Sequence, residues 1–103
     1  MNETFARMQS QLIAEEGLSP AWAAILAETA LYRFGPEARS AAVEWMNGEL
    51  SDSRRVGGAT VGEARAETGA SPFQAICILD SLSADPMRLQ PAVWQIWRDG
   101  VHE

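Results

Sequence analysis

The side chains that could act as nucleophile, base or acid pair are few in this chain and poorly placed for catalysis. Cys77, the only cysteine, lies in the apolar run AICIL, and apolar surroundings raise the pKa of a thiol and lower its reactivity. His102, the only histidine, stands next to the last residue, where we expect a frayed end. Glu15 and Glu16 are adjacent, so on a helix their carboxylates diverge. We therefore expect no enzyme activity and no catalytic residue.

Metal and nucleotide sites are not predicted either. One thiol and one imidazole cannot form a zinc site, and the carboxylates lack EF-hand spacing. The glycines of the segment SDSRRVGG are not followed by the lysine of a phosphate-binding loop. We expect no metal and no cofactor. The adjacent bases of that segment, Arg54 and Arg55, are either solvated or contact a small anion, an acidic partner or a nucleic-acid backbone.

Composition favours a single acidic globular domain spanning residues 1–103. Apolar residues make up 47% and charged residues 21%, and fourteen acids against eight bases give a net charge of −6. All eight bases are arginine, a usage typical of GC-rich bacterial or phage genomes. A negative surface repels phosphates, so binding to nucleic acid or to an anionic membrane is disfavoured. The sequence contains no long apolar run and begins with acid rather than base, so we expect a cytoplasmic protein.

Capping and breaking residues predict three helices in residues 1–50. Phe5, Met8 and Leu12 recur at helical spacing before Gly17, which is suited to a helix C-terminus. Ser19-Pro20 predicts the start of a second helix that runs to about residue 34, is apolar nearly all round and belongs in the centre of a bundle. Gly35-Pro36 predicts the start of a third helix that runs to about residue 50. Residues 51–58 are expected to form a flexible loop.

The C-terminal part, residues 59–103, begins with two capping signals. Thr60 to Glu63 has the pattern of a capping box, and Ser71 to Gln74 repeats it. Between them Gly69 suits a tight turn with a positive φ. This layout predicts two short helices joined by a turn.

Residues 59–82 resemble the helix-turn-helix superfamily. Ala64, Gly69, Ala70, Ala75 and Ile78 occupy positions where that family has small, turn and core residues. Arg65 and Thr68 depart from its pattern. The resemblance implies a second helix that reads DNA, for which base contacts need Arg, Lys, Asn or Gln and phosphate contacts need cations.

The two faces of that second helix favour protein contact over DNA contact. Ala75, Ile78, Leu79 and Leu82 share one side of a helical wheel and are expected to point inward. The opposite side, which corresponds to the DNA-reading surface, carries Phe73, Ile76, Cys77 and Asp80 and no base. Two alternatives remain open for this side: it is buried against other helices, or it stays exposed and docks a protein.

Residues 83–103 contain a further candidate anchor. Asp85-Pro86 interrupts a connector, and Pro91 suits the start of a last helix ending at Gly100. Trp94 and Trp97 share one arc of this helix. A short wing-like hairpin over residues 93–102 is the alternative.

Together these observations predict an all-α protein, a compact bundle of five to six short helices with a helix-turn-helix-like pair in its C-terminal half. We expect a protein–protein interaction module, an adaptor, regulator or inhibitor that masks a basic surface of its partner, and a homodimer is an option. The expected partner-binding residues are Phe73, Ile76, Asp80, Trp94 and Trp97. The alternatives are a helix-turn-helix transcriptional regulator and a structural subunit of a larger assembly.

Overall fold

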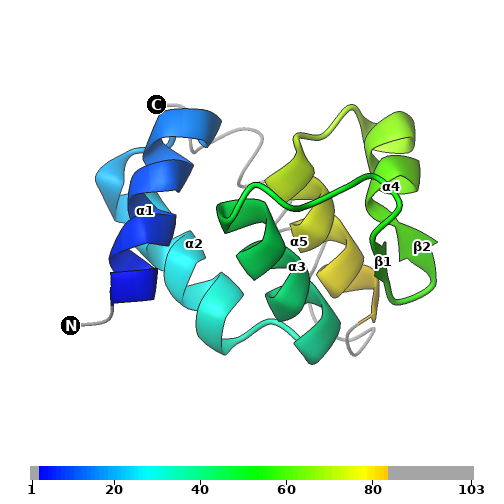
Figure 1. Ribbon diagram of the computed structural model, residues 1–103. Coiled ribbons are helices and arrows are strands. Elements are labelled where there is room, and N and C mark those ends of the chain that lie inside the picture. Colours follow the sequence, from blue (N-terminus) through cyan, green and yellow to red (C-terminus); the bar gives the residue numbers. More distant parts are fainter. Residues whose placement is uncertain (1–2, 84–103) are drawn as a thin grey trace.

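A computed structural model describes residues 3–83. Within this range the chain forms five helices and one two-stranded antiparallel ribbon (Figure 1). In chain order they are α1 (Glu3–Glu16), α2 (Pro20–Tyr32), α3 (Pro36–Met46), β1 (Arg55–Val56), β2 (Ala59–Thr60), α4 (Val61–Thr68) and α5 (Pro72–Ser83). The predicted all-α architecture is confirmed.

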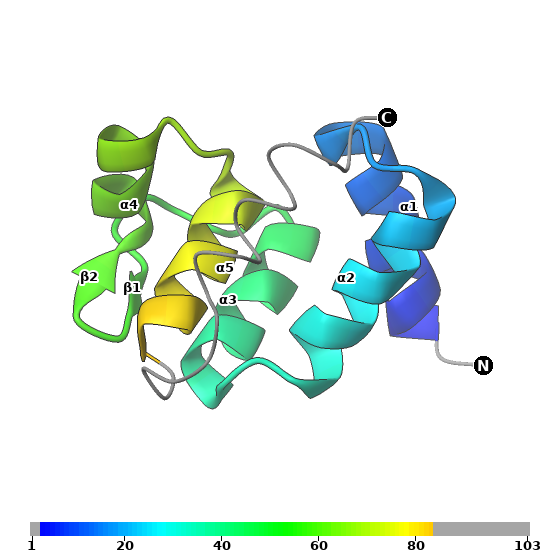
Figure 2. The same cartoon turned by 180° about the vertical axis from the view of Figure 1, so that it is seen from behind.

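The helices lie beside one another in the order α1, α2, α3, α5, α4, and the β-ribbon lies next to α4 (Figures 1 and 2). One hydrophobic core runs through this row and includes Met8 and Leu12 of α1, Trp45 of α3, and Phe73 and Ile76 of α5. Within this row α3 packs on α2 and α5, and α5 packs on α3 and α4. These two helices therefore lie at the centre.

The helix expected at the centre of the bundle, α2, lies nearer one end of the row. Its start is as predicted, because the Ser19 hydroxyl accepts from the amide of Trp22 at 3.3 Å and Pro20 occupies the first turn. Its small residues Ala23, Ala27 and Ala30 are buried. However, Ile25 and Tyr32 are more than half exposed. The apolar residues of α2 thus serve packing against α1 and α3, and part of the helix surface remains exposed.

Residues 51–58, expected as a flexible loop, include an ordered strand. Arg55 pairs with Thr60 and Val56 with Ala59, so Gly57 and Gly58 form a two-residue hairpin turn. Gly57 has a φ of 66°, and hairpin turns of this length need a positive φ that glycine adopts without strain. The preceding helix, α3, ends at Met46, earlier than predicted.

The predicted helix-turn-helix layout of α4 and α5 is confirmed. The Thr60 hydroxyl accepts from the amide of Glu63 at 3.1 Å, and the Glu63 carboxylate accepts from the amide of Thr60 at 2.8 Å. Hydrogen bonds from the backbone and side chain of Thr60 lower the pKa of Glu63. Ser71 and Gln74 exchange the same pair of bonds at the start of α5. Gly69, with a φ of 73°, ends α4.

The predictions for residues 84–103, a connector followed by a helix or a wing-like hairpin, lie outside the described residues. Among the described residues, no helix has the length and apolar character needed to cross a membrane.

Candidate functional site

The side of α5 that sequence reasoning offered as a docking or DNA-reading surface is part of the core. Phe73 and Ile76 have no exposed surface, and Cys77 and Asp80 are also buried. The ring of Phe73 packs on that of Trp45, with centroids 4.8 Å apart and planes inclined by 60°, a favourable tilted arrangement. Of the two alternatives left open, burial is the one found. Phe73 and Ile76 are therefore not accessible as interface anchors in this structure.

Asp80, also expected at the interface, instead links α5 to the start of α3. The amide of Gly35 donates to Asp80 Oδ1 at 2.9 Å. Gly35 is the N-cap residue of α3 and has no side chain to accept a hydrogen bond. Asp80 thus places a carboxylate at the positive end of the α3 dipole, where negative charge is stabilising.

The opposite side of α5 contains the one exposed large residue of this helix. Leu82, expected to point inward, is 75% exposed, and Ile78 is only partly buried. The expectation is wrong for Leu82, whereas Ile78 packs against the core from a partly buried position. Because α5 packs on both α3 and α4 (Figure 1), a division into one inner and one outer face does not describe it.

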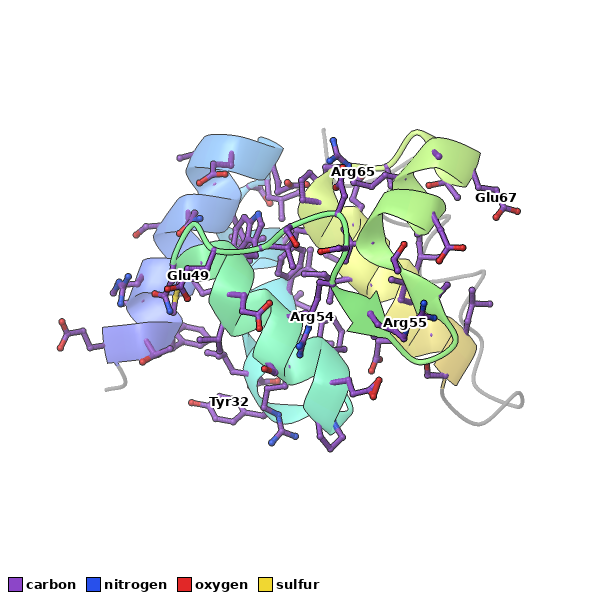
Figure 3. All side chains as sticks on the ribbon, turned by 45° about the vertical axis from the view of Figure 1, so that its right-hand side comes forward. Tyr32, Glu49, Arg54, Arg55, Arg65 and Glu67 are labelled. Carbon is purple, nitrogen blue, oxygen red and sulfur yellow. The ribbon has the colours of Figure 1, made fainter. Side chains whose placement is uncertain are left out.

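Arg54, one of the two predicted anion contacts, is held against α3. Its Nη1 lies 3.5 Å from a carboxylate oxygen of Glu44, and its Nη2 donates to the carbonyl oxygen of Glu37 at 3.3 Å. Figure 3 shows Arg54 extending over this helix. Its Nε is buried and has no hydrogen-bond partner. Arg54 therefore links the β-hairpin to α3.

Arg55, the residue after Arg54, points to the opposite side of the two-stranded β-ribbon from Arg54 (Figure 3). It is exposed, and its Nη1 donates to the carbonyl oxygen of Gly58 at 3.2 Å in the adjoining turn (Figure 3). The two neighbouring arginines therefore do not form one basic patch. The remaining predicted contacts, Trp94 and Trp97, lie outside the described residues.

A groove borders the hairpin and the C-terminal end of α5. Its acidic half is a cavity of about 260 Å³ between the first turn of α3, Val56 and the α5 residues Asp80 and Ser83. Two carboxylates line this half. That of Asp80 accepts from Gly35, as described above, and that of Glu37 accepts from the amide of Gly57 at 2.6 Å.

The apolar half of the groove adjoins the acidic half through Val56 and Ser83, which line both. It has a volume of about 470 Å³ and is completed by Gly57, Gly58, Ala59, Leu79 and Leu82. The close approach of the hairpin to α5 depends on glycine, because a Cβ at position 57 would collide with the Ser83 hydroxyl. The groove therefore joins two carboxylates to an apolar wall, which suits a ligand that is cationic at one end and apolar beside it.

Sequence reasoning missed this groove. Glu37 was not singled out, and Leu82 was assigned to the core. The available signals were Gly35-Pro36 and Gly57-Gly58, which mark close backbone approaches, although nothing in the sequence places them next to each other.

Cys77 is buried, and burial, followed by the nearby charges of Glu16 and Asp80, raises the pKa of its thiol well above the ordinary value. We expect the native protein to react slowly with a thiol reagent such as DTNB at mildly alkaline pH, and to react at once in denaturant, because only unfolding exposes and ionises the sulfur. Time courses of the reaction with DTNB, recorded with and without denaturant, measure both rates. Equal rates would show that Cys77 is accessible.

Comparisons with known proteins give no family or relative. No protein-family model, no curated protein and no solved structure matches the chain. Among residues 3–83, no group of three or more histidine, cysteine, aspartate or glutamate side chains is placed to hold a metal ion.

Proposed function

We propose that this protein is a small acidic protein–protein interaction module that acts as an adaptor, regulator or inhibitor by masking a basic surface of a partner protein. The observation that carries the proposal is an asymmetry of charge in the described part of the chain. Its arginines are all engaged within the protein, whereas several of its carboxylates are free.

Each of the six arginines between residues 3 and 83 has a partner in its own chain. Three form ion pairs with carboxylates, namely Arg33 with Glu28, Arg54 with Glu44 and Arg65 with Asp52. The other three donate to neutral oxygens, Arg7 to Asn47, Arg39 to the carbonyl of Phe34 and Arg55 to that of Gly58. Carboxylates thus offset the charges of the first three arginines, whereas the other three are held in place by neutral oxygens.

Four exposed carboxylates, by contrast, make no hydrogen bond or ion pair in the described structure. They are Glu3, Glu15, Glu49 and Glu67. In Figure 3 Glu49 lies in the left half of the molecule and Glu67 extends from its right edge, so these free carboxylates are well separated on the surface. Such a distribution attracts a basic partner from a distance and repels an acidic one.

The burial of α5 favours this proposal over the DNA-binding alternative. A DNA-reading helix presents polar or basic side chains to the base edges, whereas Phe73, Ile76 and Cys77 are covered. Most other positions on α5 are apolar or carry hydroxyl groups, and the helix has no base.

The proposal predicts binding to a basic peptide that depends on the free carboxylates. The probe is a fluorescein-labelled peptide of alternating arginine and leucine, followed by fluorescence anisotropy at low salt. Combining Glu15→Gln, Glu49→Gln and Glu67→Gln is expected to weaken binding roughly fivefold, about 1 kcal/mol, because exposed charges each contribute modestly. The effect is expected to shrink as salt screens the charges.

Ser40→Asn is the control, because it changes an exposed uncharged side chain. It is expected to bind as the unmodified protein does. Absence of peptide binding at low salt, or equal binding by the triple variant and the control, would contradict the proposal.

A further inference from the structure

We propose that the groove between the β-hairpin and the end of α5 is the place where the module holds one arginine or lysine side chain of its partner, with an apolar partner residue beside it. The inference rests on the proposed function and adds a location and a chemistry to it. The cationic end would lie against Asp80 and Glu37, and the apolar neighbour against Leu82.

The acidic half of the groove is suited to a cation because neither of its two carboxylates is paired with a cationic side chain of the described chain. Asp80 is 6% exposed, yet its hydrogen-bond donor is the neutral amide of Gly35. Glu37 likewise accepts from the neutral amide of Gly57. No arginine of the described chain forms an ion pair with either carboxylate. A guanidinium or ammonium group bound here would form charge-assisted hydrogen bonds, which are stronger than bonds between neutral groups.

Two guanidinium groups approach the same end of α3 without occupying the groove. Arg39 donates to the carbonyl of Phe34 and Arg54 to that of Glu37, and neither residue lines the cavity. Arg39 thus binds the backbone just before α3 and Arg54 binds that of its first turn, and both leave the carboxylates of Asp80 and Glu37 available.

An anion is a poor alternative occupant of this half. The first turn of α3 lines the cavity, and a helix N-terminus carries about half a positive charge. The carboxylates of Asp80 and Glu37 together carry two negative charges, which outweigh it.

The apolar half determines what lies next to the cation. Its wall is built from Val56, Ala59, Leu79 and Leu82 with the two turn glycines, and it carries no charged side chain. Leu82 is the most exposed large apolar residue in the described chain, at 75%. Burying it under an apolar partner residue is favourable. The groove therefore fits an arginine or lysine with an apolar neighbour better than a run of basic residues.

The experiment measures affinity of the full-length chain for the arginine–leucine peptide in single variants of each half. Asp80→Asn keeps an oxygen that accepts from Gly35 and removes the charge, and it is expected to weaken binding at least about tenfold. Leu82→Ser is expected to weaken it about fivefold. The matched controls, Glu67→Gln on α4 and Ile25→Ser on α2, are expected to change affinity less than about twofold.

Two further peptides separate the halves of the groove. With arginine replaced by the neutral isostere citrulline, binding is expected to be lost. With leucine replaced by glycine, Leu82→Ser is expected to have no effect, while Asp80→Asn keeps its effect. Circular dichroism checks that each variant is folded, and Leu82→Ser, at an exposed position, keeps the test decisive if Asp80→Asn unfolds.

The outcomes distinguish the groove from the general proposal. Loss of affinity in the groove variants beyond that of their controls supports the groove. If the peptide binds and the triple glutamate variant weakens it, but Asp80→Asn and Leu82→Ser match their controls, the groove is wrong and the acidic module stands. If the peptide does not bind at all, both are wrong.

Discussion

Replacing Phe73 by alanine is expected to lower the free energy of unfolding by about 3–5 kcal/mol, the usual cost of removing a buried aromatic ring. Phe73 has no exposed surface and contacts the ring of Trp45, so its loss leaves a cavity where α3 and α5 meet. The loss is a large part of the 5–15 kcal/mol that stabilises a typical domain. Urea unfolding followed by circular dichroism measures it.

Leu82→Ala is the matched control on the same helix. Leu82 is 75% exposed, and surface substitutions usually change stability by less than about 0.5 kcal/mol. Similar small effects for Phe73→Ala and Leu82→Ala would contradict the assignment of Phe73 to the core and would restore it as an interface candidate.

Replacing Gly57 by alanine is the second substitution with a large expected effect. Its φ of 66° is strained for any residue with a Cβ, and the left-handed region costs such residues roughly 1–2 kcal/mol. The new Cβ would also collide with the Ser83 hydroxyl and come within 3.2 Å of the Ser83 Cβ. We expect a loss of more than about 2 kcal/mol in the free energy of unfolding, because strain and collision add.

Gly58→Ala, at the other turn position, is the control, since a Cβ there meets no atom within 4 Å and its φ is not positive. Combining Gly57→Ala with Ser83→Gly is expected to recover the part of the loss that comes from the collision and to leave the conformational strain. A double variant whose loss equals the sum of the losses of Gly57→Ala and Ser83→Gly would show that the hairpin and α5 are not in close contact.

Local signals in the sequence predicted much of the fold. Four local features are found where they were expected. They are the N-cap at Ser19, the capping box at Thr60, the second capping box at Ser71 and the turn at Gly69. These features succeed because each depends on side chains a few residues from the backbone groups that they bind.

The faces of α5 could not be predicted in the same way. A helical wheel separates one apolar side from the other, but it does not report how many neighbours the helix has. Because α3 and α4 pack on different sides of α5, Phe73 and Leu79 are both buried. The hairpin was missed because Gly57-Gly58 is equally compatible with a loop, and strands of two residues carry no periodic pattern.

The groove depends on contacts between residues distant in sequence. Asp80 meets Gly35 across 45 positions, and Glu37 meets Gly57 across 20. No spacing rule brings these residues together, so Asp80 was expected on an exposed interface although it is buried against the start of α3. Leu82 was assigned to the core because its position on the wheel matches buried Ala75 and Leu79.

The α4–α5 pair combines a helix-turn-helix layout with a second helix whose exposed residues are Leu82 and Ser83, at its end. In this protein the layout stabilises the core, and α5 contributes to the proposed binding groove through its last turns. Under the proposed function, the charge of the protein selects the partner, and the helix-turn-helix shape does not.

Under the proposed function, the protein selects basic protein surfaces and not DNA. The most direct measurement is a pair of anisotropy titrations of the full-length chain, one with the labelled arginine–leucine peptide and one with a labelled DNA duplex, in the same low-salt buffer. We predict saturable binding of the peptide that weakens as salt is added, and no binding of the duplex. A duplex complex with steep salt dependence, together with no binding of the peptide, would contradict the claim.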